Sequence, residues 1–363
     1  MGLLDCEMRP FEKCIKKVKY TNKIANKDFK EEGRFPIVSQ EEVFISGYWD
    51  NPADVFHVES PVVIFGDHSR HIKYVDFDFV IGADGVKILA PVEDIDAKYL
   101  YYYLRNLRIK SLGYSRHYKV LKEMSVPVTS MIEQRRIVAE LDLLSGIIEK
   151  KNAQLRTLDE LANTIFYEMF GNPVLNDKAW ASEKMKDIAP QKAYFGHIPT
   201  NNGMQWLLNL DMVESQTGKI IEKVLFSSAD IGNSTTTFNE DNILYSKLRP
   251  YLNKVVIPDE PGYCTSELVP LLPKKGVINR IFLAYLLRSK FFVDYINTRV
   301  AGAKMPRVTM SDFWGFDIII PPLRLQESFA EKISAIEKQK SLIRTSLSPA
   351  ENLLAARMDK YFC

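Results

Sequence analysis

The stretch Ser125-Val-Pro-Val-Thr-Ser-Met131 leads to Gln134 and then into an unbroken helical pattern. A second stretch, Asp317-Ile-Ile-Ile-Pro-Pro-Leu323, leads to Gln326 and a similar pattern. The two glutamines are 192 residues apart, and this offset aligns the two helical patterns along their whole length. The chain therefore contains an internal repeat, which determines its architecture more firmly than any single motif does.

Both patterns, 131–170 and 322–362, place apolar residues at alternating spacings of three and four, which is the seam of a coiled coil. Lys151 interrupts the first seam and Lys340 the second, at positions that do not correspond, so we expect the two helices to pack on each other. Each would be about 60 Å long at 1.5 Å per residue. Ser348-Pro-Ala-Glu351 has the form of a capping box and predicts a kink or restart of the second helix. The residues expected to pack between the helices are Ile137, Leu141, Leu144, Ile148, Leu155, Leu158, Ile165, Phe329, Ile333, Ile336, Ile343, Leu347 and Leu354.

The segments outside the helices also resemble each other. Tyr99-Leu-Tyr-Tyr-Tyr-Leu-Arg105 matches Phe282-Leu-Ala-Tyr-Leu-Leu-Arg288, each predicted to form a short helix. Before them, alternation through Val75, Phe77, Phe79 and Ile81 predicts one half-buried strand, and 243–248 and 254–257 predict strands around a turn at Arg249-Pro250. The predicted fold class is α+β with a pseudo-two-fold repeat and two antiparallel coiled-coil helices. Its parts are a first domain at 1–129, a helix at 130–172, a second domain at 173–320 and a helix at 321–363.

Composition limits the function classes. The 363 residues carry 48 Lys and Arg against 46 Asp and Glu, a net charge of +2, which excludes a highly basic tail-type binder and an acidic disordered chain. No apolar run approaches the ~18 residues of a membrane span, and no secretory signal is visible, so we expect a cytoplasmic protein without a membrane partner. The four cysteines, Cys6, Cys14, Cys264 and Cys363, are too scattered for a zinc site or a disulfide framework.

Motifs for catalysis or cofactor binding are not found. The sequence has no G-x-G, no phosphate-binding loop for a nucleoside triphosphate, and no Asp/Asn-Pro-Pro-aromatic tetrapeptide of an adenine methyltransferase. His68 and His71 have metal-ligand spacing without an apparent third ligand, and Asp96-Ala-Lys98 is only half of a nuclease motif. We therefore expect a non-catalytic chain that holds no metal and no cofactor of its own.

Polar clusters on loops recur in both halves, and their Arg, Lys, Thr and His side chains are types that grip phosphates or read base edges. Seven lysines also lie between Lys13 and Lys30. An isolated exposed charge means little, but clusters repeated in both halves favour contact with double-stranded DNA. The candidate DNA-binding residues are Asp67, His68, Arg70, His71, Lys73, Arg116, His117, Tyr118, Lys119, Thr235, Thr236, Lys247, Arg249, Tyr251, Lys254, Lys304 and Arg307.

With these features the sequence resembles the specificity subunit of a type I restriction–modification system. The resemblance covers essentially the whole chain, although the first helix start has Thr129-Ser130 where the family usually has Pro-Pro. It is carried by Met131-Ile-Glu-Gln-Arg-Arg-Ile-Val-Ala-Glu-Leu141, Pro321-Pro-Leu-Arg-Leu-Gln326, Pro61-Val-Val-Ile-Phe-Gly-Asp-His68, Gly82-Ala-Asp-Gly85 and Leu244-Tyr-Ser-Lys-Leu-Arg-Pro250.

The resemblance implies that each domain reads one half of a bipartite, asymmetric target, while the helices measure the unread spacer. Two modification subunits would supply adenine N6 methylation with S-adenosylmethionine, and a restriction subunit would join through them and use ATP and Mg. Three alternatives remain open at this point. They are the specificity subunit of a two-subunit system whose partner fuses nuclease and methyltransferase, a coiled-coil protein scaffold, and a single-chain restriction or methylation enzyme.

Overall fold

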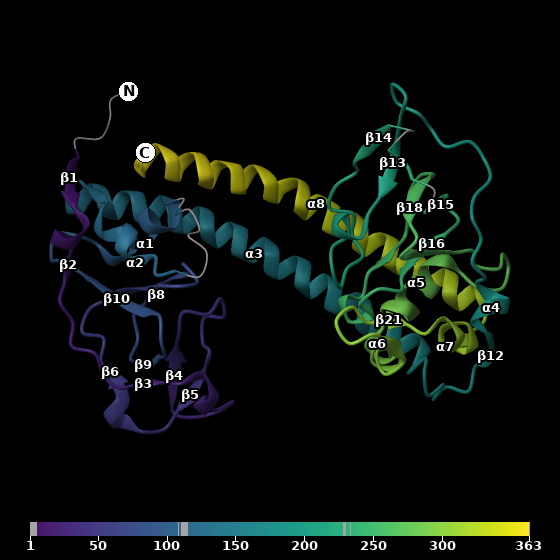
Figure 1. The fold of residues 1–363 in the computed structure, drawn as a ribbon, viewed down its shortest axis with the longest axis horizontal. Coiled ribbons are helices and arrows are strands. Elements are labelled where there is room, and N and C mark those ends of the chain that lie inside the picture. The colour runs from purple at the N-terminus through teal and green to yellow at the C-terminus, as the bar shows by residue number, and fades with distance from the viewer. Residues whose placement is uncertain (1–5, 108, 110–114, 228–229, 233, 363) are drawn as a thin grey trace. The chain divides into compact units, whose positions relative to one another are not determined.

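The structure is a computed structural model that describes residues 6–107, 109, 115–227, 230–232 and 234–362. It divides into two compact units. The first comprises Met1–Asn152 with Arg344–Cys363, and the second comprises Ala153–Ile343. Each unit holds one mixed α+β domain and part of each long helix (Figure 1). Within the described residues, no helix combines the length and apolarity that crossing a membrane requires.

The first unit contains three sheets. Their strand orders are β1-β11, β2-β10-β7-β8 and β3-β9-β4-β5, with β6 paired to β9. The elements are β1 (Glu7–Pro10), η1 (Phe11–Lys13), β2 (Ile15–Lys16), β3 (Lys23–Ile24), η2 (Asn26–Asp28), β4 (Phe35–Val38), β5 (Gly47–Trp49), η3 (Pro52–Asp54), β6 (Val55–Phe56), β7 (Val62–Gly66), β8 (Ile72–Val75), β9 (Phe79–Gly82), β10 (Val86–Pro91), α1 (Ala97–Asn106), α2 (Tyr118–Lys122) and β11 (Ser125–Val128).

The second unit has the sheets β12-β22, β14-β13-β18-β15, β17-β16-β19 and β20-β21. Its elements are β12 (Ala181–Lys184), α4 (Met185–Ile188), β13 (Met204–Leu208), η4 (Leu210–Met212), β14 (Leu225–Ser227), β15 (Thr235–Phe238), β16 (Ile243–Ser246), η5 (Pro250–Leu252), β17 (Val255–Val256), β18 (Gly262–Thr265), β19 (Leu268–Leu271), α5 (Arg280–Arg288), α6 (Lys290–Asn297), β20 (Val300–Ala301), β21 (Arg307–Val308), α7 (Met310–Gly315) and β22 (Asp317–Ile320).

The two domains share one chain order. Strands β4 to β10 followed by α1 correspond one to one to strands β13 to β19 followed by α5. The pairings agree, because β9 runs parallel to β4, as β18 does to β13, and β7 pairs antiparallel with both β8 and β10, as β16 does with β17 and β19. The predicted α+β class with an internal repeat is confirmed.

One sequence prediction was wrong in detail. The alternation from Val75 to Ile81 belongs to two strands, β8 and β9, and not to a single half-buried strand. All four residues of β9 are buried, because this strand has partners in β3, β4 and β6 and lies inside its sheet. The turn expected at Arg249-Pro250 is present, where η5 begins at Pro250.

The long helices are α3 (Met131–Phe170) and α8 (Leu323–Phe362). They are antiparallel within each unit. In the first unit Glu140 contacts Arg357 and Tyr361, and in the second Lys340 contacts Asp159. Helix α8 continues through Pro349, so it does not restart there, and the alternative of a kink stays a prediction.

The first turn of each long helix contains a buried glutamine that anchors the helix to its domain. Gln134 Oε1 accepts a hydrogen bond from Asp96 N–H (2.9 Å), while its Nε2 donates to Asp94 O (2.9 Å) and Thr129 O (2.8 Å). Gln326 repeats the arrangement, accepting from Asn279 N–H (2.7 Å) and donating to the carbonyl oxygens of residues 277 (3.1 Å) and 321 (2.7 Å). Both glutamines are 0% exposed. The repeat found in the sequence is thus a repeat of hydrogen bonds.

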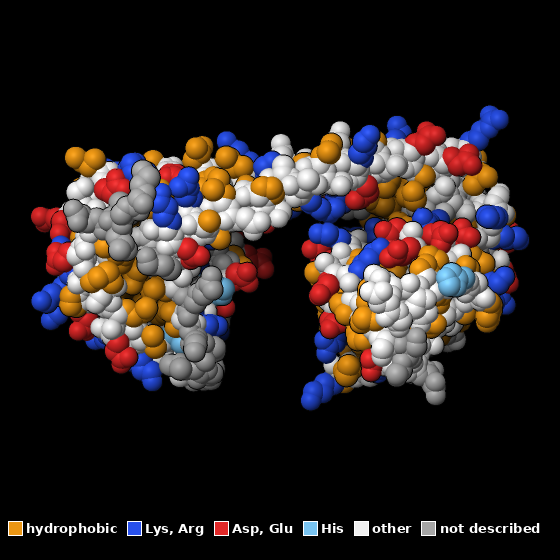
Figure 2. All heavy atoms as spheres, turned by 90° about the horizontal axis from the view of Figure 1, so that it is seen from above, with side chains coloured by type: hydrophobic (Ala, Val, Ile, Leu, Met, Phe, Trp, Pro, Cys, Tyr) orange, Lys and Arg blue, Asp and Glu red, His pale blue; other side chains and the backbone are white. Residues whose placement is uncertain are grey.

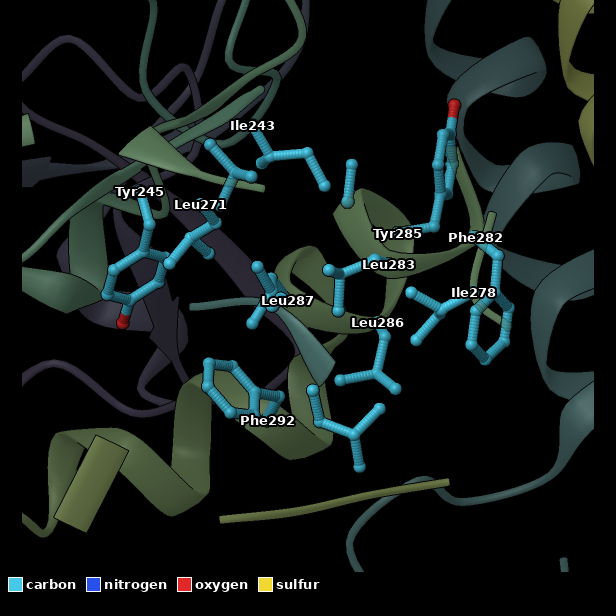
Figure 3. Close-up of a cluster of buried hydrophobic side chains, with 14 of the residues drawn as sticks. Ile243, Tyr245, Leu271, Ile278, Phe282, Leu283, Tyr285, Leu286, Leu287 and Phe292 are labelled. Carbon is cyan, nitrogen blue, oxygen red and sulfur yellow. The ribbon is translucent and has the colours of Figure 1, made fainter. Parts of the chain in front are cut away.

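The core of the second unit forms where α5 packs between the sheet and the helix pair. Figure 3 shows Leu283 and Leu287 of α5 on the side of the strand residues Ile243 and Leu271. Phe282, from the same helix, lies 4.6 Å from the ring of Phe170 at the end of α3. In the first unit the end of α8 is placed in the same way beside α1, since Phe362 packs on the rings of Tyr99 and Tyr103.

Candidate nucleic-acid interface

Three loops meet at the same place in both units and are joined by matching backbone hydrogen bonds. In the first unit Asp67 N–H donates to Gly85 O (2.7 Å), and Asp67 O accepts from His117 N–H (2.8 Å). In the second, Lys247 N–H donates to Glu267 O (3.0 Å), and Lys247 O accepts from Val308 N–H (2.8 Å). We call the loop that joins β7 to β8 in the first unit (residues 67–71), and the loop that joins β16 to β17 in the second (residues 247–254), the hairpin loop. It is where the polar clusters of the sequence converge.

Another loop, which is not part of the three-loop junction, lies against each hairpin loop. This covering loop comprises residues 39–46 between β4 and β5, and 209–224 between β13 and β14. In the first unit Gln40 Oε1 accepts from His68 N–H (3.2 Å), and Gln40 O accepts from Ser69 Oγ. In the second unit, Gln216 donates from its backbone N–H to Leu252 O (2.9 Å) and from Nε2 to Tyr251 O (3.0 Å).

The first hairpin loop exposes one arginine. Arg70 has left-handed backbone torsion (φ 65°), and its guanidinium donates to Ile109 O (2.8 Å) at the surface. His68 and His71 are half-buried on the same loop, and Arg116 and Lys119 are exposed on the neighbouring segment. Tyr118 begins α2, with the ammonium groups of Lys87 and Lys122 over its ring.

Two lysines absent from our sequence-based list join this surface. Desolvation, and then the positive field of Lys87, lower the pKa of Lys23, and Arg116 adds to the effect while Asp84 opposes it. Lys23 Nζ donates to the backbone at Asp84 O (3.3 Å). Burial is the main cause of the lowered pKa of Lys23, and the neighbouring cations Lys87 and Arg116 add a positive field that attracts an anion. The alternation in Val86–Pro91, where Lys87 is the only charged residue, could have identified this lysine.

The second hairpin loop has the same character. Arg249 also has left-handed torsion (φ 49°), and among the described residues its buried Nε has no hydrogen-bond partner. Lys247 is half-buried, and Tyr251 is 48% exposed. Arg307 is exposed and forms a salt bridge with Glu267 (2.9 Å), and Lys304 is exposed nearby in the chain. Thr235 and Thr236 lie half-buried on β15, where they pair with Thr265 and Cys264 of β18, and Thr235 Oγ1 donates to Gly232 O (2.9 Å).

Four further candidates use their side chains to hold loops together. Asp67 is 3% exposed and accepts from Tyr118 N–H (2.8 Å), while His117 is 1% exposed against Asp67 O. Lys73 is 5% exposed, and its ammonium donates to three backbone carbonyls. Lys254 Nζ donates to Leu210 O (2.6 Å). Their side chains hold loops in place, which a loop sequence alone does not reveal.

The residues expected between the helices are all buried or half-buried. Those buried are Ile137, Leu141, Phe329, Ile333 and Ile336, and those half-buried are Leu144, Ile148, Leu155, Leu158, Ile165, Ile343, Leu347 and Leu354. The two irregular seam positions have partners on the other helix. Lys151 Nζ donates to Ser346 Oγ (2.6 Å), and Lys340, 4% exposed, donates to Asp159 (2.6 Å).

Other chemistry-bearing groups lie apart from this interface. In the part of the chain that the structure describes, no three His, Cys, Asp or Glu side chains form a metal-binding group. Cys6, Cys14 and Cys264 are free thiols, and Cys363 lies outside the described residues. Figure 2 shows Lys and Arg side chains interspersed with Asp and Glu on the visible faces of both units.

Comparisons with known proteins agree with this geometry. A sequence model of the family described as "Type I restriction modification DNA specificity domain" matches residues 211–351. The specificity subunit of the Escherichia coli type I restriction enzyme EcoR124I/EcoR124II is 22% identical over 364 residues, covering 93% of this chain and 87% of that protein. The MjaVIII specificity subunit of Methanocaldococcus jannaschii is 24% identical over 267 residues, 65% of this chain and 62% of that one.

A solved structure shares the fold. The type I restriction–modification S subunit from M. genitalium superposes with a TM-score of 0.62 at 15% identity, covering 99% of this chain and 96% of that one. Two α+β units with a duplicated loop junction and an antiparallel helix pair thus define the class of fold. The resemblance to the specificity subunits of type I restriction–modification systems, inferred from the sequence, is confirmed.

Proposed function

We propose that the chain is the DNA-recognition subunit of a type I restriction–modification complex, reading a bipartite, asymmetric target with one half-site per unit. The observation that carries this proposal is the three-loop junction that is built twice, with matching backbone hydrogen bonds and with cations on the hairpin loop each time. Arginine and lysine on exposed loops suit phosphates and guanine edges. The two long helices then act as a ruler for the spacer.

In this proposal the chain recognises the DNA sequence, and its partner subunits catalyse the reactions. Two modification subunits hold S-adenosylmethionine and methylate adenine N6, and a restriction subunit that uses ATP and Mg joins through them in the cytoplasm. Docking on the long helices is supported by large apolar side chains exposed there. These are Ile132 (84%), Leu143 (67%) and Ile147 (37%) on α3 in the first unit, Leu161 (45%) on α3 in the second, and Leu342 (65%) and Leu353 (45%) on α8. Figure 2 shows hydrophobic side chains at the surface of the helices.

Domain exchange combined with methylome sequencing tests the proposal. Replacing residues 1–129 with the first domain of another specificity subunit should change one half of the methylated motif and leave the other half and the spacer length unchanged. If both halves change together, the units are not independent readers. If no methylated motif depends on the chain and it binds no duplex, the coiled-coil scaffold is the better account. Methylation by a single fused nuclease–methyltransferase partner would identify the two-subunit variant.

A further inference from the structure

Lys73 lies on β8, and its ammonium is buried beneath the covering loop of the first unit. Nζ donates to Ser39 O (3.0 Å), Val43 O (2.6 Å) and Phe44 O (3.4 Å), so one side chain binds the start and the tip of the loop. The side chain is 5% exposed. Its three N–H donors are matched by three carbonyl oxygens, which leaves no donor for a phosphate.

In the second unit a lysine ammonium also donates to a carbonyl oxygen of the covering loop. Lys254 immediately precedes β17, the counterpart of β8, and donates to Leu210 O (2.6 Å) in the covering loop 209–224. Each lysine also lies in the field of one acidic residue of its covering loop, Glu41 for Lys73 and Asp211 for Lys254. The two lysines are not at identical register positions, since Ser246 N–H donates to Lys254 O where Gly66 N–H donates to His71 O. The contact between a lysine ammonium and the covering loop therefore recurs, although the lysine occupies a different register position in each unit.

The loop held by Lys73 is adapted to bases more than to phosphates. Its tip carries Glu41 and Glu42, both exposed, with Val43 (65% exposed) and Phe44 (44% exposed). Loop 39–46 has no lysine or arginine. Carboxylates accept from the cytosine amino group and apolar side chains contact the thymine methyl group, whereas neither type neutralises a phosphate. Its contact with His68 and Ser69 places it beside the hairpin loop.

We propose that Lys73 and Lys254 are positioning residues for DNA recognition, which hold the covering loops of their units, Lys73 through three backbone carbonyls and Lys254 through one, so that each loop reads bases beside the hairpin loop. This inference rests on the proposed function. It assigns these two lysines a different role from direct DNA contact, and it adds the covering loops to the reading surface.

The clamp of the first unit should respond to pH. Burial lowers the pKa of Lys73 to about 8, with Glu41 as the opposing influence. Above that pH the amine keeps two N–H donors for three carbonyls, so the loop loses at least one of its bonds. Because the folded pKa lies below the unfolded one, the unfolded chain binds more protons between about pH 8 and pH 10.5, and this group makes the fold more stable with rising pH, not less. Loss of discrimination without loss of stability is thus expected.

The test uses the full-length chain and a cognate duplex selected from a randomised pool, with single-mismatch duplexes for comparison. Lys73→Met should lower the ratio of cognate to mismatch affinity by about 10-fold, one base contact, and leave the slope of log K against log salt unchanged. The matched control is Lys150→Met, an exposed lysine of α3. Wild-type discrimination should fall between pH 7 and pH 9, and that of Lys73→Met should not.

A second variant does not depend on the buried site. Val43→Glu adds a charge at the exposed loop tip and should weaken cognate binding by about 10-fold, whereas Met8→Glu, at a residue 60% exposed on β1, should not. The proposal is overturned if Lys73→Met weakens all duplexes equally and reduces the salt slope by about 1, as for a phosphate contact. It is also overturned if Val43→Glu has no effect on a folded chain. Failure of the wild-type chain to bind any duplex would instead refute the proposed function.

Discussion

Replacing the buried glutamine at the start of a long helix should destabilise one unit strongly. In Gln326→Leu the side chain has nearly the same length but no polar atoms. Asn279 N–H then loses its acceptor, and the carbonyl oxygens of Val277 and Pro321 lose their donor, at a site that is 0% exposed. A buried polar group without a partner costs about 1–3 kcal/mol. Three such groups at the low end cost about 3 kcal/mol in total.

The magnitude can be converted to a melting temperature for the unit concerned. For a domain of 150–250 residues, 1 kcal/mol lowers the melting temperature by about 2–4 °C, so a fall of about 6–12 °C is expected in the transition of Ala153–Ile343. Calorimetry of the full chain measures it, and hydrogen exchange at the Asn279 amide localises it. Gln134→Leu should produce the same effect in the other unit.

The control is Gln154→Leu on α3, because Gln154 is exposed and a surface substitution changes stability by about 0.5 kcal/mol or less. If Gln326→Leu melts within 2 °C of this control, with unchanged exchange at Asn279, the reasoning is refuted. The anchoring of the helix would then come from apolar contacts alone.

Other outcomes follow from the helix pair and the loops. Lys340→Met should change stability by about 1 kcal/mol or less in thermal denaturation, whereas Asp159→Ala leaves the buried ammonium with Glu337 as its remaining partner and should cost about 1–3 kcal/mol; equal effects would contradict a contribution of Asp159 to holding the ammonium. Affinity for a cognate duplex should fall steeply with salt, since phosphate contacts dominate, and a slope near zero would exclude a grip on the DNA backbone. A fragment of residues 1–173 should dimerise through α3, because it lacks the α8 segment that covers Ile137 and Leu141; light scattering showing a monomer at high micromolar concentration would contradict the pseudo-dimer.

The sequence predicts the two long helices and their packing on each other well, because apolar residues spaced three and four apart recur in every turn of each helix. The bounds of α3 and α8 agree with the predicted 131–170 and 322–362 to within one residue. Gln134 and Gln326 were visible as an offset, but their bonds were not, since the partners at residues 94–96 and 277–279 lie far away in the sequence. The spacing of residues in the sequence identifies such positions but does not identify their hydrogen-bond partners.

The candidate interface was harder to predict because burial in a loop depends on distant segments. Lys73 and Arg70 look alike in the sequence, yet one is covered by residues 39–46 and the other faces solvent. Lys87 was missed for the opposite reason, since it lies in a strand whose neighbours are apolar and only the fold brings it beside Lys23 and Asp67. Residue type identifies candidate DNA-binding residues, and tertiary contacts determine which of them can contact DNA and which hold a loop in place.

Under the proposed function, the duplicated junction is one frame that reads two different half-sites. Its bonds join backbone groups, and the residues that supply them differ in chemistry between the units: Asp67 corresponds to Lys247, and Gly85 to Glu267. A backbone hydrogen bond is made by any residue except proline as donor, so the same bonds form in both units although Asp67 and Lys247 carry opposite charges. Because a base is recognised by side chains while these junction bonds join backbone groups, the proposed function allows the two units to read different bases on the same junction. An asymmetric target is then the expected consequence of a symmetric fold.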